Sequence, residues 1–412
     1  MTGTRIGGTG KRKHLITGAL LLFLCCSLLG CGSKEKVTLS IWVSEAKTEL
    51  MEGFMKDFQK IHEDEVEIEY HISKEDEDTC RETILANPKG AADIFAFADD
   101  QLDDLRDAGV LLDLSDDPKE ALKSFGGEDS VAYESVVRDG KLYAYPETAN
   151  GYFMYYNKKY FKDDDVKTLD RMIEIAGNTE RKVTMDFNSG WYLYSFFKGA
   201  GLDVRPDESG EKNICNWNAK DTPHTGLSVA KAMTAITAKR GFEARDDDGF
   251  VDGVQAGTVI AGINGAWNAD KIKEAWGEDF AATKLPTYTV DGEQVQMASF
   301  TGYKVLGVSA ATQHPEWCRK FVEFVSSSDN QILEYEKTGE IPANLDVANS
   351  GQVKDDPVVE ALAEQSKHAS LQRVAGSFWD ATAKFGAALA SGNPDKRDLQ
   401  GLLDEMVKGI TG

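Results

Sequence analysis

The chain has 412 residues, a length of about two to three domains, and its 41% hydrophobic and 28% charged residues are an ordinary balance for a soluble protein. Its 69 acidic residues outnumber its 46 basic ones, which gives a net charge of −23. This charge argues against a general nucleic-acid binder and against broad adhesion to an anionic membrane, because both need a basic surface.

The first 31 residues have the pattern of an export signal. A short basic stretch precedes a mostly apolar run of 16 residues, 15–30, which is shorter than the roughly 20 needed to span a bilayer. The run ends in Leu28-Leu29-Gly30-Cys31, which resembles the bacterial lipobox. That resemblance implies cleavage before Cys31 and its acylation, with palmitate for example, so that lipid alone anchors the protein to the outer surface of the bacterial membrane. We therefore predict a signal peptide over residues 1–30 and a lipidated tether over 31–36.

Cleavage would leave a mature chain of 382 residues with a net charge of −27, because residues 1–30 contain four basic residues and no acidic one. Besides Cys31, it would contain Cys80, Cys215 and Cys318. Three cysteines cannot all be paired within one chain, and no CxxC spacing is present. We therefore expect buried free thiols, although an exported location permits a bridge between two of them.

The mature chain alternates strand-like and helix-like segments. Residues 37–43 alternate like a strand, and apolar residues recur at helical spacing over 48–62. Further strands are predicted at 66–72, 92–98, 141–146, 152–157, 185–188, 259–264 and 304–309. Further helices are predicted at 75–86, 101–108, 191–198, 230–239, 269–276, 315–326, 358–367, 377–391 and 399–410. This order predicts an α/β protein with mainly parallel sheets.

Motifs of common enzymes and metal sites are missing from the sequence. It has no HExxH, no GxSxG and no Walker-type phosphate loop, and its six histidines are scattered. Residues 246–253 are acidic, but their glycine and aspartate spacing does not match a calcium loop. We interpret the acidic runs 75–78 and 246–248 as solvated surface. We predict no catalytic residue, no metal and no cofactor.

Five ordered sets of segments resemble the extracellular solute-binding proteins of ABC sugar importers, the maltose/maltodextrin-binding group in particular. They are LSIW at 39–42, ADIFAFADD at 92–100 with GVLLDL at 109–114, GKLYAYP at 140–146 with YNK at 156–158, AGINGAW at 261–267 with LPTY at 285–288, and SFWD at 377–380. Together they extend over essentially the whole mature chain. Each segment alone is a weak signal, whereas the ordered set is specific.

The resemblance implies a two-lobed periplasmic-binding-protein-like fold, in which crossing strands join the lobes and a hinge closes them over a ligand in the cleft. Each lobe is expected to be discontinuous in sequence. Residues 37–146 and 289–345 should form the first lobe, and residues 150–288 and 350–412 the second. The crossing segment 146–151 contains a proline and a glycine, which suits one end of a hinge.

The resemblance also implies a set of ligand-binding residues. A sugar ring stacks its apolar face on aromatic side chains, and its hydroxyls hydrogen-bond to polar ones. The matching aromatic positions are Phe97, Trp191, Tyr192, Trp267 and Trp379. The matching polar positions are Lys47, Asp100 and, on the hinge strand, Asn150.

Several polar positions depart from the family's pattern. Ala46, Gln101, Asn150 and Ser189 stand where the family has an acid, an arginine and two glutamates. The aromatic platform is thus kept, while the groups that bind hydroxyls are changed. This pattern implies a maltodextrin-type α-glucan or a related oligosaccharide, with the linkage and chain length left open.

The resulting hypothesis is a monomeric, lipid-anchored substrate-binding component of an ABC importer. Its partners would be an oligosaccharide and the transmembrane subunits of the permease. One alternative is the same fold with a non-sugar solute, such as a polyamine, iron or a phosphate ester. Another is an exported enzyme that acts on glycans. The number of aromatic residues predicted at the cleft favours a sugar.

Overall fold

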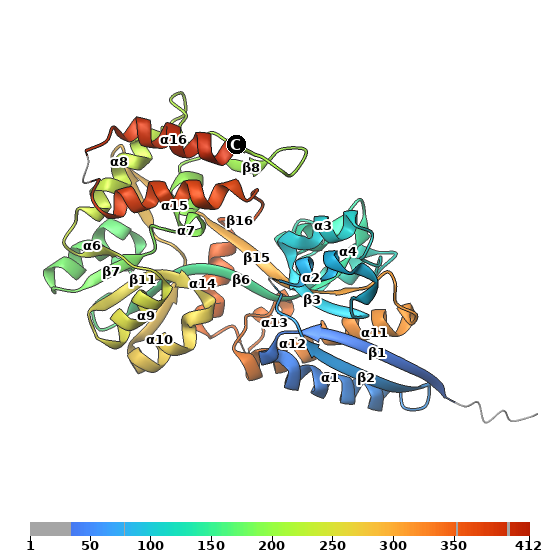
Figure 1. Cartoon of the computed structure of the whole chain (residues 1–412). Coiled ribbons are helices and arrows are strands. Elements are labelled where there is room, and N and C mark those ends of the chain that lie inside the picture. Colours follow the sequence, from blue (N-terminus) through green and yellow to red (C-terminus); the bar gives the residue numbers. More distant parts are fainter. Residues whose placement is uncertain (1–33, 78, 352, 394–395) are drawn as a thin grey trace, which may run out of the picture.

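The computed structural model describes residues 34–77, 79–351, 353–393 and 396–412, so the predicted signal peptide and Cys31 lie outside the described residues. Helices flank a sheet in each of two lobes, and two long strands run between the lobes (Figure 1). This architecture confirms the predicted two-lobed α/β class.

The first lobe is built on a sheet in the order β2-β1-β3-β15-β6. The strands are β1 (Glu35–Val43), β2 (Val66–Lys74), β3 (Ile94–Ala98), β6 (Ala144–Asn157) and β15 (Ser299–Val308). β1 pairs in parallel with β2 and β3, whereas β15 runs antiparallel to β3 and β6. Alternate residues of β1, including Leu39, Ile41 and Val43, are buried, as a strand with one covered face requires.

Helices cover this sheet because one face of each is apolar. In α1 (Thr48–Ile61) the residues Met51, Phe54, Met55 and Phe58 recur at helical spacing and are buried. The other helices of this lobe are α2 (Cys80–Ala86), α3 (Leu102–Asp107), α4 (Pro118–Ala121), α5 (Val131–Val136), α11 (Pro315–Val325), α12 (Ser328–Thr338) and α13 (Leu345–Ala348). They enclose one hydrophobic core that extends from Val37 to Ala343 in sequence.

The strands β6 and β15 carry the sheet from one lobe to the other. The first half of β6 pairs with β15, and its second half pairs with β11 (Val259–Gly265) and β12 (Phe280–Thr283). The two extended runs predicted from the sequence are therefore one strand. The register of β6 against β15 shifts at Glu147, where Lys304 faces Thr148 and Val305 faces Pro146. Such an irregularity suits a proline, which has no N–H for the ladder.

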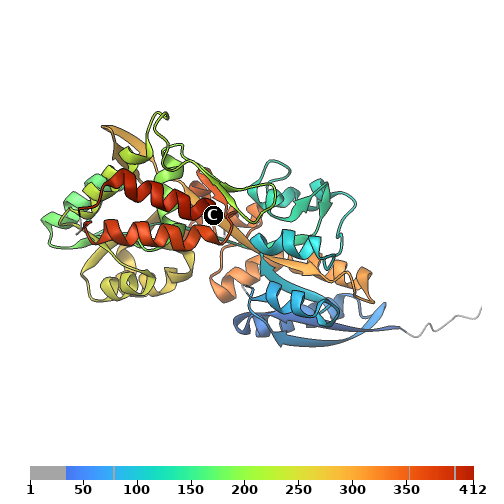
Figure 2. The same cartoon turned by 45° about the horizontal axis from the view of Figure 1, so that its top comes forward.

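The second lobe continues the sheet through β11 to β7 (Lys182–Met185) and β10 (Phe242–Ala244). Its helices are α6 (Leu169–Asn178), α7 (Gly190–Gly199), α8 (Gly226–Thr237), α9 (Asp247–Gln255), α10 (Ala269–Trp276), α14 (Pro357–Ser366), α15 (Ser377–Ala390) and α16 (Leu399–Thr411). The last two lie side by side on the outside of the lobe (Figures 1 and 2). Aromatic rings fill the core beneath them, where Trp217 stacks on Phe197 at 4.2 Å.

The chain returns to the first lobe later than the sequence predicted. A hairpin of β13 (Thr287–Val290) and β14 (Glu293–Gln296) packs on the second lobe, and Val290 and Met297 are buried in that lobe's core. The Tyr288 hydroxyl donates to the Phe196 carbonyl at 2.6 Å. The predicted boundary at residue 289 is therefore wrong, because these apolar residues are covered by the second lobe.

The remaining short strands pair locally or along the hinge. They are β4 (Val137–Arg138) with β5 (Lys141–Leu142), β8 (Val204–Pro206) with β9 (Asn213–Cys215), and β16 (Ala369–Leu371), which pairs in parallel with β15.

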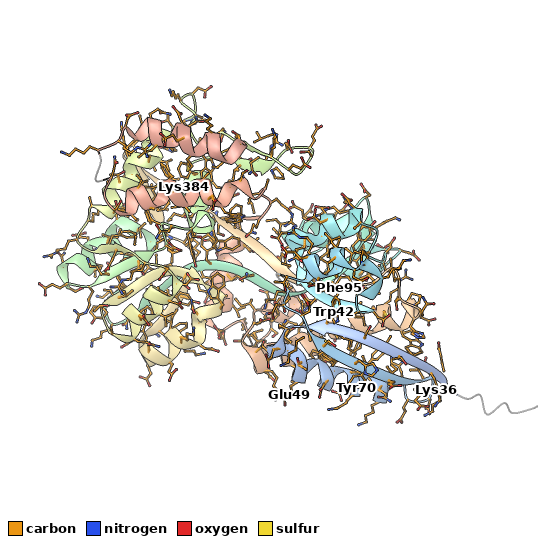
Figure 3. The ribbon with its side chains drawn as sticks, viewed as in Figure 1. Lys36, Trp42, Glu49, Tyr70, Phe95 and Lys384 are labelled. Carbon is orange, nitrogen blue, oxygen red and sulfur yellow. The ribbon has the colours of Figure 1, made fainter. Side chains whose placement is uncertain are left out.

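The start of β1 lies far from the second lobe. Lys36 in β1 is at the end of the first lobe farthest from the second lobe, and Trp42 lies toward the crossing strands (Figure 3). β1 therefore begins away from the interlobe region.

The three described cysteines are free thiols. Burial raises the pKa of each of them, Cys80, Cys215 and Cys318, to about 12. Within the described residues, no helix is both long enough and apolar enough to cross a membrane.

Candidate functional site

Two adjoining hollows lie between the lobes. The first, of about 490 Å³, is lined by Glu77, Arg81, Ala98, Asp99, Asp100, Gln101, Asn150, Trp191, Gly302, Tyr303, Lys304 and Gln372. The second, of about 260 Å³, is lined by Thr148, Ala149, Asn150, Ala266, Trp267, Asp270, Lys304, Thr338, Gly339, Glu340 and Ile341. Both include Asn150 of β6 and Lys304 of β15, so they meet at the crossing strands. We call the two together the cleft.

Four predicted residues line the cleft. Asp100 and Trp191 are in the first hollow, Trp267 is in the second, and Asn150 is shared by both. Asp100 follows the end of β3, Trp191 is the second residue of α7 and Trp267 follows β11. Strand ends of open α/β sheets face the ligand crevice, which explains why residues so far apart in sequence meet here.

Trp267 presents a half-exposed ring to the cleft. Its side chain is in the short helix Ala266–Asn268 after β11, and the residue is 49% exposed. The Nε1–H donates to Oδ2 of Asp247 at 2.9 Å. A Cβ on Gly265 would lie 2.1 Å from the indole, so glycine at this position allows the ring to lie against the backbone. The ring therefore has a defined place and an open surface.

Trp191, the second indole of the cleft, is held in place by packing against other aromatic side chains. Its ring stacks on Phe300 with centroids 5.5 Å apart and meets Tyr152 edge-on at the same distance. Its backbone carbonyl accepts from the Tyr152 hydroxyl at 2.8 Å. Among the described residues, no partner accepts from its buried Nε1. The cleft thus has two indoles at separate places on the second lobe.

The first lobe provides charged and polar groups to the same cleft. Asp100 accepts from Gln372 Nε2 at 3.0 Å, and its neighbour Asp99 accepts from Arg373 Nη2 at 2.6 Å and from the Tyr303 backbone N–H at 2.7 Å. Burial and the adjacent Asp99 raise the pKa of Asp100, although Arg373 and Arg81 oppose that shift. These carboxylates and amides are groups that can exchange hydrogen bonds with hydroxyls.

Lys47 does not reach the cleft, contrary to the sequence prediction. Its side chain is 2% exposed, and its Nζ lies 3.0 Å from Glu147, 2.5 Å from Glu334 and 2.9 Å from Glu340. Burial alone would lower the pKa of Lys47, but the three carboxylates raise it well above its usual value. Burial and the charge of Glu147 raise the pKa of Glu334 to about 8. Lys47 therefore neutralises a buried cluster of carboxylates and has no surface for a sugar.

Phe97 and Tyr192 are also corrected by the structure. Phe97 is fully buried in the first-lobe core beside Phe95, because both point into the covered interior of the lobe. Tyr192 is 3% exposed, and its hydroxyl donates to Oδ1 of Asp247 at 2.8 Å. Neither ring offers a ligand a face in this structure.

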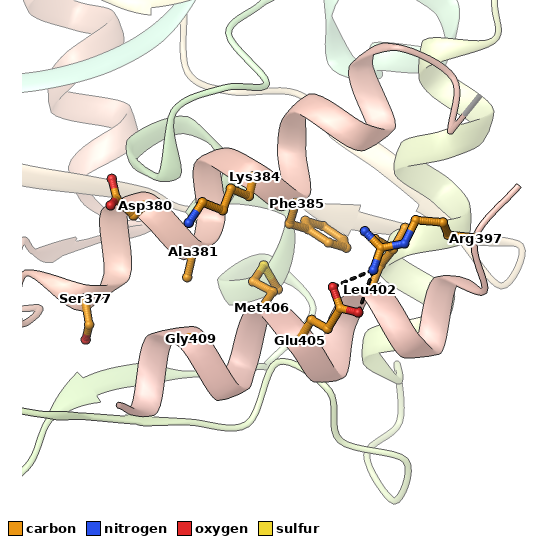
Figure 4. Close-up of a pocket in the computed structure, with 10 residues that line it drawn as sticks. All are labelled: Ser377, Asp380, Ala381, Lys384, Phe385, Arg397, Leu402, Glu405, Met406 and Gly409. Atoms are coloured by element: carbon orange, nitrogen blue, oxygen red, sulfur yellow. Dashed lines mark hydrogen bonds and ion pairs between the residues drawn. The ribbon is translucent and has the colours of Figure 1, made fainter. Parts of the chain in front are cut away.

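Trp379 lies on α15, half-buried against the second-lobe core and edge-on to Phe378 at 5.0 Å. Within the described part of the chain, it does not line either hollow of the cleft. A separate groove on the same lobe lies between α15 and α16, where Arg397 pairs with Glu405 beside Phe385 and Met406 (Figure 4). That groove contains none of the predicted site residues.

Sequence reasoning missed one group that lines the cleft, Lys304, and one that contacts a cleft residue, Asp247. Lys304 lines both hollows and its Nζ lies 2.7 Å from Glu340. The prediction of solvated surface over 246–248 does not hold for Asp247, which is half-buried and receives hydrogen bonds from Trp267 and Tyr192. The position of Asp247 in an acidic run at the start of α9 gave no signal, whereas the place of Lys304 on a predicted strand next to Tyr303 could have suggested that Lys304 reaches the cleft. Within the described residues, no three side chains of His, Cys, Asp or Glu are grouped to hold a metal ion.

Comparison with known proteins agrees with the two-lobed fold. Residues 53–361 match the family described as bacterial extracellular solute-binding protein. The chain belongs to this family. The match covers most of the chain and both lobes, and the family is a class of binding proteins.

The chain is also similar to individual solute-binding proteins over most of its length. The chain is 28% identical to the maltodextrin-binding protein MdxE of Bacillus subtilis, over 84% of this chain and 85% of that protein. It is 25% identical to a maltooligosaccharide ABC transporter solute-binding lipoprotein of Streptococcus pneumoniae, over 99% and 98% of the two chains. A solved structure with acarbose has a TM-score of 0.76 and 29% identity, over 92% of this chain and 99% of that chain.

Proposed function

We propose that this protein captures oligosaccharides, most specifically maltodextrin-type α-glucans, as the substrate-binding component of an ABC importer. The observation that carries the proposal is the half-exposed Trp267 indole in a cleft that also contains Trp191, Asp100 and Asn150. Indole faces suit the apolar face of a sugar ring, and the carboxylate and amide suit its hydroxyls. The names of the relatives above support the choice of an α-glucan.

Capture proceeds by closure of the two lobes about β6 and β15. The aromatic groups come from the second lobe and Asp100 comes from the first, so a sugar contacts both sets at once only when the lobes approach. A ligand that contacts more groups in the closed form shifts the population toward that form. In this proposal Trp379, on the second lobe beside the core, also contacts the sugar in the closed form.

The protein is delivered as a monomer on the outer face of the membrane and is held there by acylated Cys31. β1, which follows Cys31 in the chain, starts at the end of the first lobe that is away from the second (Figure 3). The bound sugar is passed to the transmembrane subunits of the permease. The protein binds its ligand and performs no chemistry on it, and it needs no cofactor or metal.

Calorimetric titration of the mature protein tests this function. The ligands are maltose, maltotriose, maltotetraose, a galactooligosaccharide, spermidine and a sugar phosphate. Binding of the α-glucans is expected, and binding of spermidine or the phosphate ester in their place would reject the proposal. Release of reducing sugar during incubation would point to an enzyme.

The variant Trp267→Ala locates the site. Removing a stacking residue should weaken binding by about 30-fold, because such residues contribute about 2 kcal/mol. The unliganded protein should unfold at nearly the same urea concentration as the parent, since the ring is half exposed. Ile214→Ala is the control, because Ile214 is 47% exposed on the same lobe and lies outside the cleft. Early unfolding with unchanged affinity would show that Trp267 is a core residue.

A further inference from the structure

One carboxylate in the second lobe connects three elements that meet at the cleft. Oδ1 of Asp247 accepts from the Tyr192 hydroxyl of α7 at 2.8 Å and from Nδ2 of Asn264 in β11 at 2.9 Å. Oδ2 accepts from Nε1 of Trp267 at 2.9 Å. Asp247 is half-buried, whereas its neighbours Asp246 and Asp248 are exposed.

The start of α9 places this carboxylate. Asp246 caps the helix, since its Oδ1 accepts from the Gly249 backbone N–H at 2.8 Å. Asp247 is therefore the first helical residue, where the partial positive charge of the helix N-terminus stabilises an anion. Of the three consecutive acidic residues, only the middle one, Asp247, is turned toward Tyr192, Asn264 and Trp267.

The donors around Asp247 require a group that only accepts. The Trp267 indole nitrogen can only donate. Asn264 is fixed in orientation, because its Oδ1 already accepts from Nδ2 of Asn268 at 2.8 Å and from the Gly265 N–H at 3.0 Å. Its Nδ2 must therefore point to Asp247. An ionised carboxylate satisfies all of these donors, and hydrogen bonds to a charged acceptor are about twice as strong as neutral ones.

Trp267 depends on this bond more than a core tryptophan would. Its residue is 49% exposed, so little packing defines the angle of the ring. The backbone at Gly265 supports the ring from one side. The hydrogen bond from Nε1 to Asp247 then sets how the ring is rotated over that backbone. Without that bond, the indole has several orientations over the glycine.

We propose that Asp247 is a positioning residue, itself fixed by donors from Tyr192 and Asn264, that holds the Trp267 indole in the orientation that receives a sugar ring. This inference rests on the proposed function, because it specifies how the aromatic surface of that site is prepared before ligand arrives. A platform that is already oriented loses less conformational freedom when it binds, which is the physical gain from the arrangement.

The first test requires no ligand. The protein, with seven tryptophans, is labelled with 5-fluorotryptophan, and Trp267→Phe assigns the Trp267 fluorine resonance. In Asp247→Asn, which keeps the size of the side chain, that resonance should shift or broaden because the ring is no longer fixed. Asp248→Asn removes the same charge from an exposed neighbour and should leave it unchanged. A Trp267 resonance that is the same in Asp247→Asn and the parent would overturn the proposal.

The second test measures affinity for maltotriose. Asp247→Asn should weaken binding by about 5- to 10-fold and Asp248→Asn by less than about 2-fold. In the Trp267→Phe background, where the ring has no N–H, the effect of Asp247→Asn should fall below about 3-fold. An undiminished effect in that background would show that Asp247 acts on the ligand directly, against the proposal.

The two tests separate the proposals. If the parent binds no oligosaccharide, the proposed function fails, while the fluorine measurement still decides whether Asp247 orients the indole. If Asp247→Asn does not fold, Trp267→Phe tests the same bond from the other side, and it should itself weaken maltotriose binding by about 5-fold. A Trp267→Phe protein with parental affinity would overturn the positioning role.

Discussion

Replacing the buried Lys47 with methionine should destabilise the protein without removing a ligand contact. The Lys47 ammonium lies within 3.0 Å of three carboxylates at a position that is 2% exposed. Methionine fills a similar volume but leaves those carboxylates without their shared cation. Removing one partner of a buried ion pair typically costs about 3–5 kcal/mol.

The structure indicates the lower end of that range. Burial and the charge of Glu147 raise the pKa of Glu334 to about 8, so Glu334 is mostly protonated at neutral pH. Glu340 keeps a second cation, because Lys304 lies 2.7 Å from it. The uncompensated charge is then mainly that of Glu147. We expect Lys47→Met to lower the free energy of unfolding by about 3 kcal/mol at pH 7.

Urea unfolding of the mature protein measures this change, and titration with maltotriose shows whether the folded variant still binds. Lys56→Met is the control, since Lys56 is exposed on α1 and pairs only loosely with Glu52 at 3.7 Å. It should unfold with the parent. A Lys47→Met protein with parental stability and strongly reduced affinity would refute the buried-cluster interpretation and restore Lys47 as a sugar ligand.

Three further outcomes are expected. The free energy of unfolding should fall as pH rises from about 5 to 8. Burial and Glu147 raise the pKa of native Glu334 to about 8, so Glu334 keeps a proton that the unfolded chain releases near pH 4.5. Urea unfolding of Glu334→Gln at several pH values should lack that part of the pH dependence. The opposite contribution of Glu340, whose pKa is lowered to about 2 by Lys47 and Lys304 in spite of burial, is lost only below this window. Small-angle scattering should give a smaller radius of gyration with maltotetraose than without, and an unchanged radius with bound sugar would contradict closure. Cys31→Ser should yield unprocessed or released protein of unchanged fold on cell fractionation, and an acylated, membrane-bound variant would contradict the lipobox prediction.

Periodicity in the sequence was sufficient to predict most of the elements. The apolar spacing of residues 48–62 predicted α1 to within a residue, and the mostly apolar run at 259–264 predicted β11. The continuity of β6 could not be predicted, because Pro146 and Gly151 both interrupt a strand pattern. In the structure, a local register shift and the neighbouring β15 compensate for the proline.

The candidate site was predicted where position along a strand determines exposure. Trp267 and Asp100 follow strand ends, and strand ends face the cleft in this fold class. Lys47 and Phe97 were wrongly assigned to the cleft, because the burial of a side chain depends on what the rest of the chain packs over it. Lys47 is covered by carboxylates from residues 147, 334 and 340, and no local pattern contains that information.

The passage of the chain back and forth through β6 and β15 constrains the order in which the protein can fold. The first-lobe core combines residues from Val37 to Tyr145 with residues from Val305 to Ala343, and the second-lobe core needs residues from Tyr152 to Ile410. During synthesis from the N-terminus, neither core can be completed until long after its first strands have formed. Contacts of such large sequence separation slow folding. The final helices α15 and α16 supply the last residues of the second-lobe core, so under the proposed export the chain would still be incomplete, in the form that a channel for unfolded polypeptide accepts, when most of it has been made.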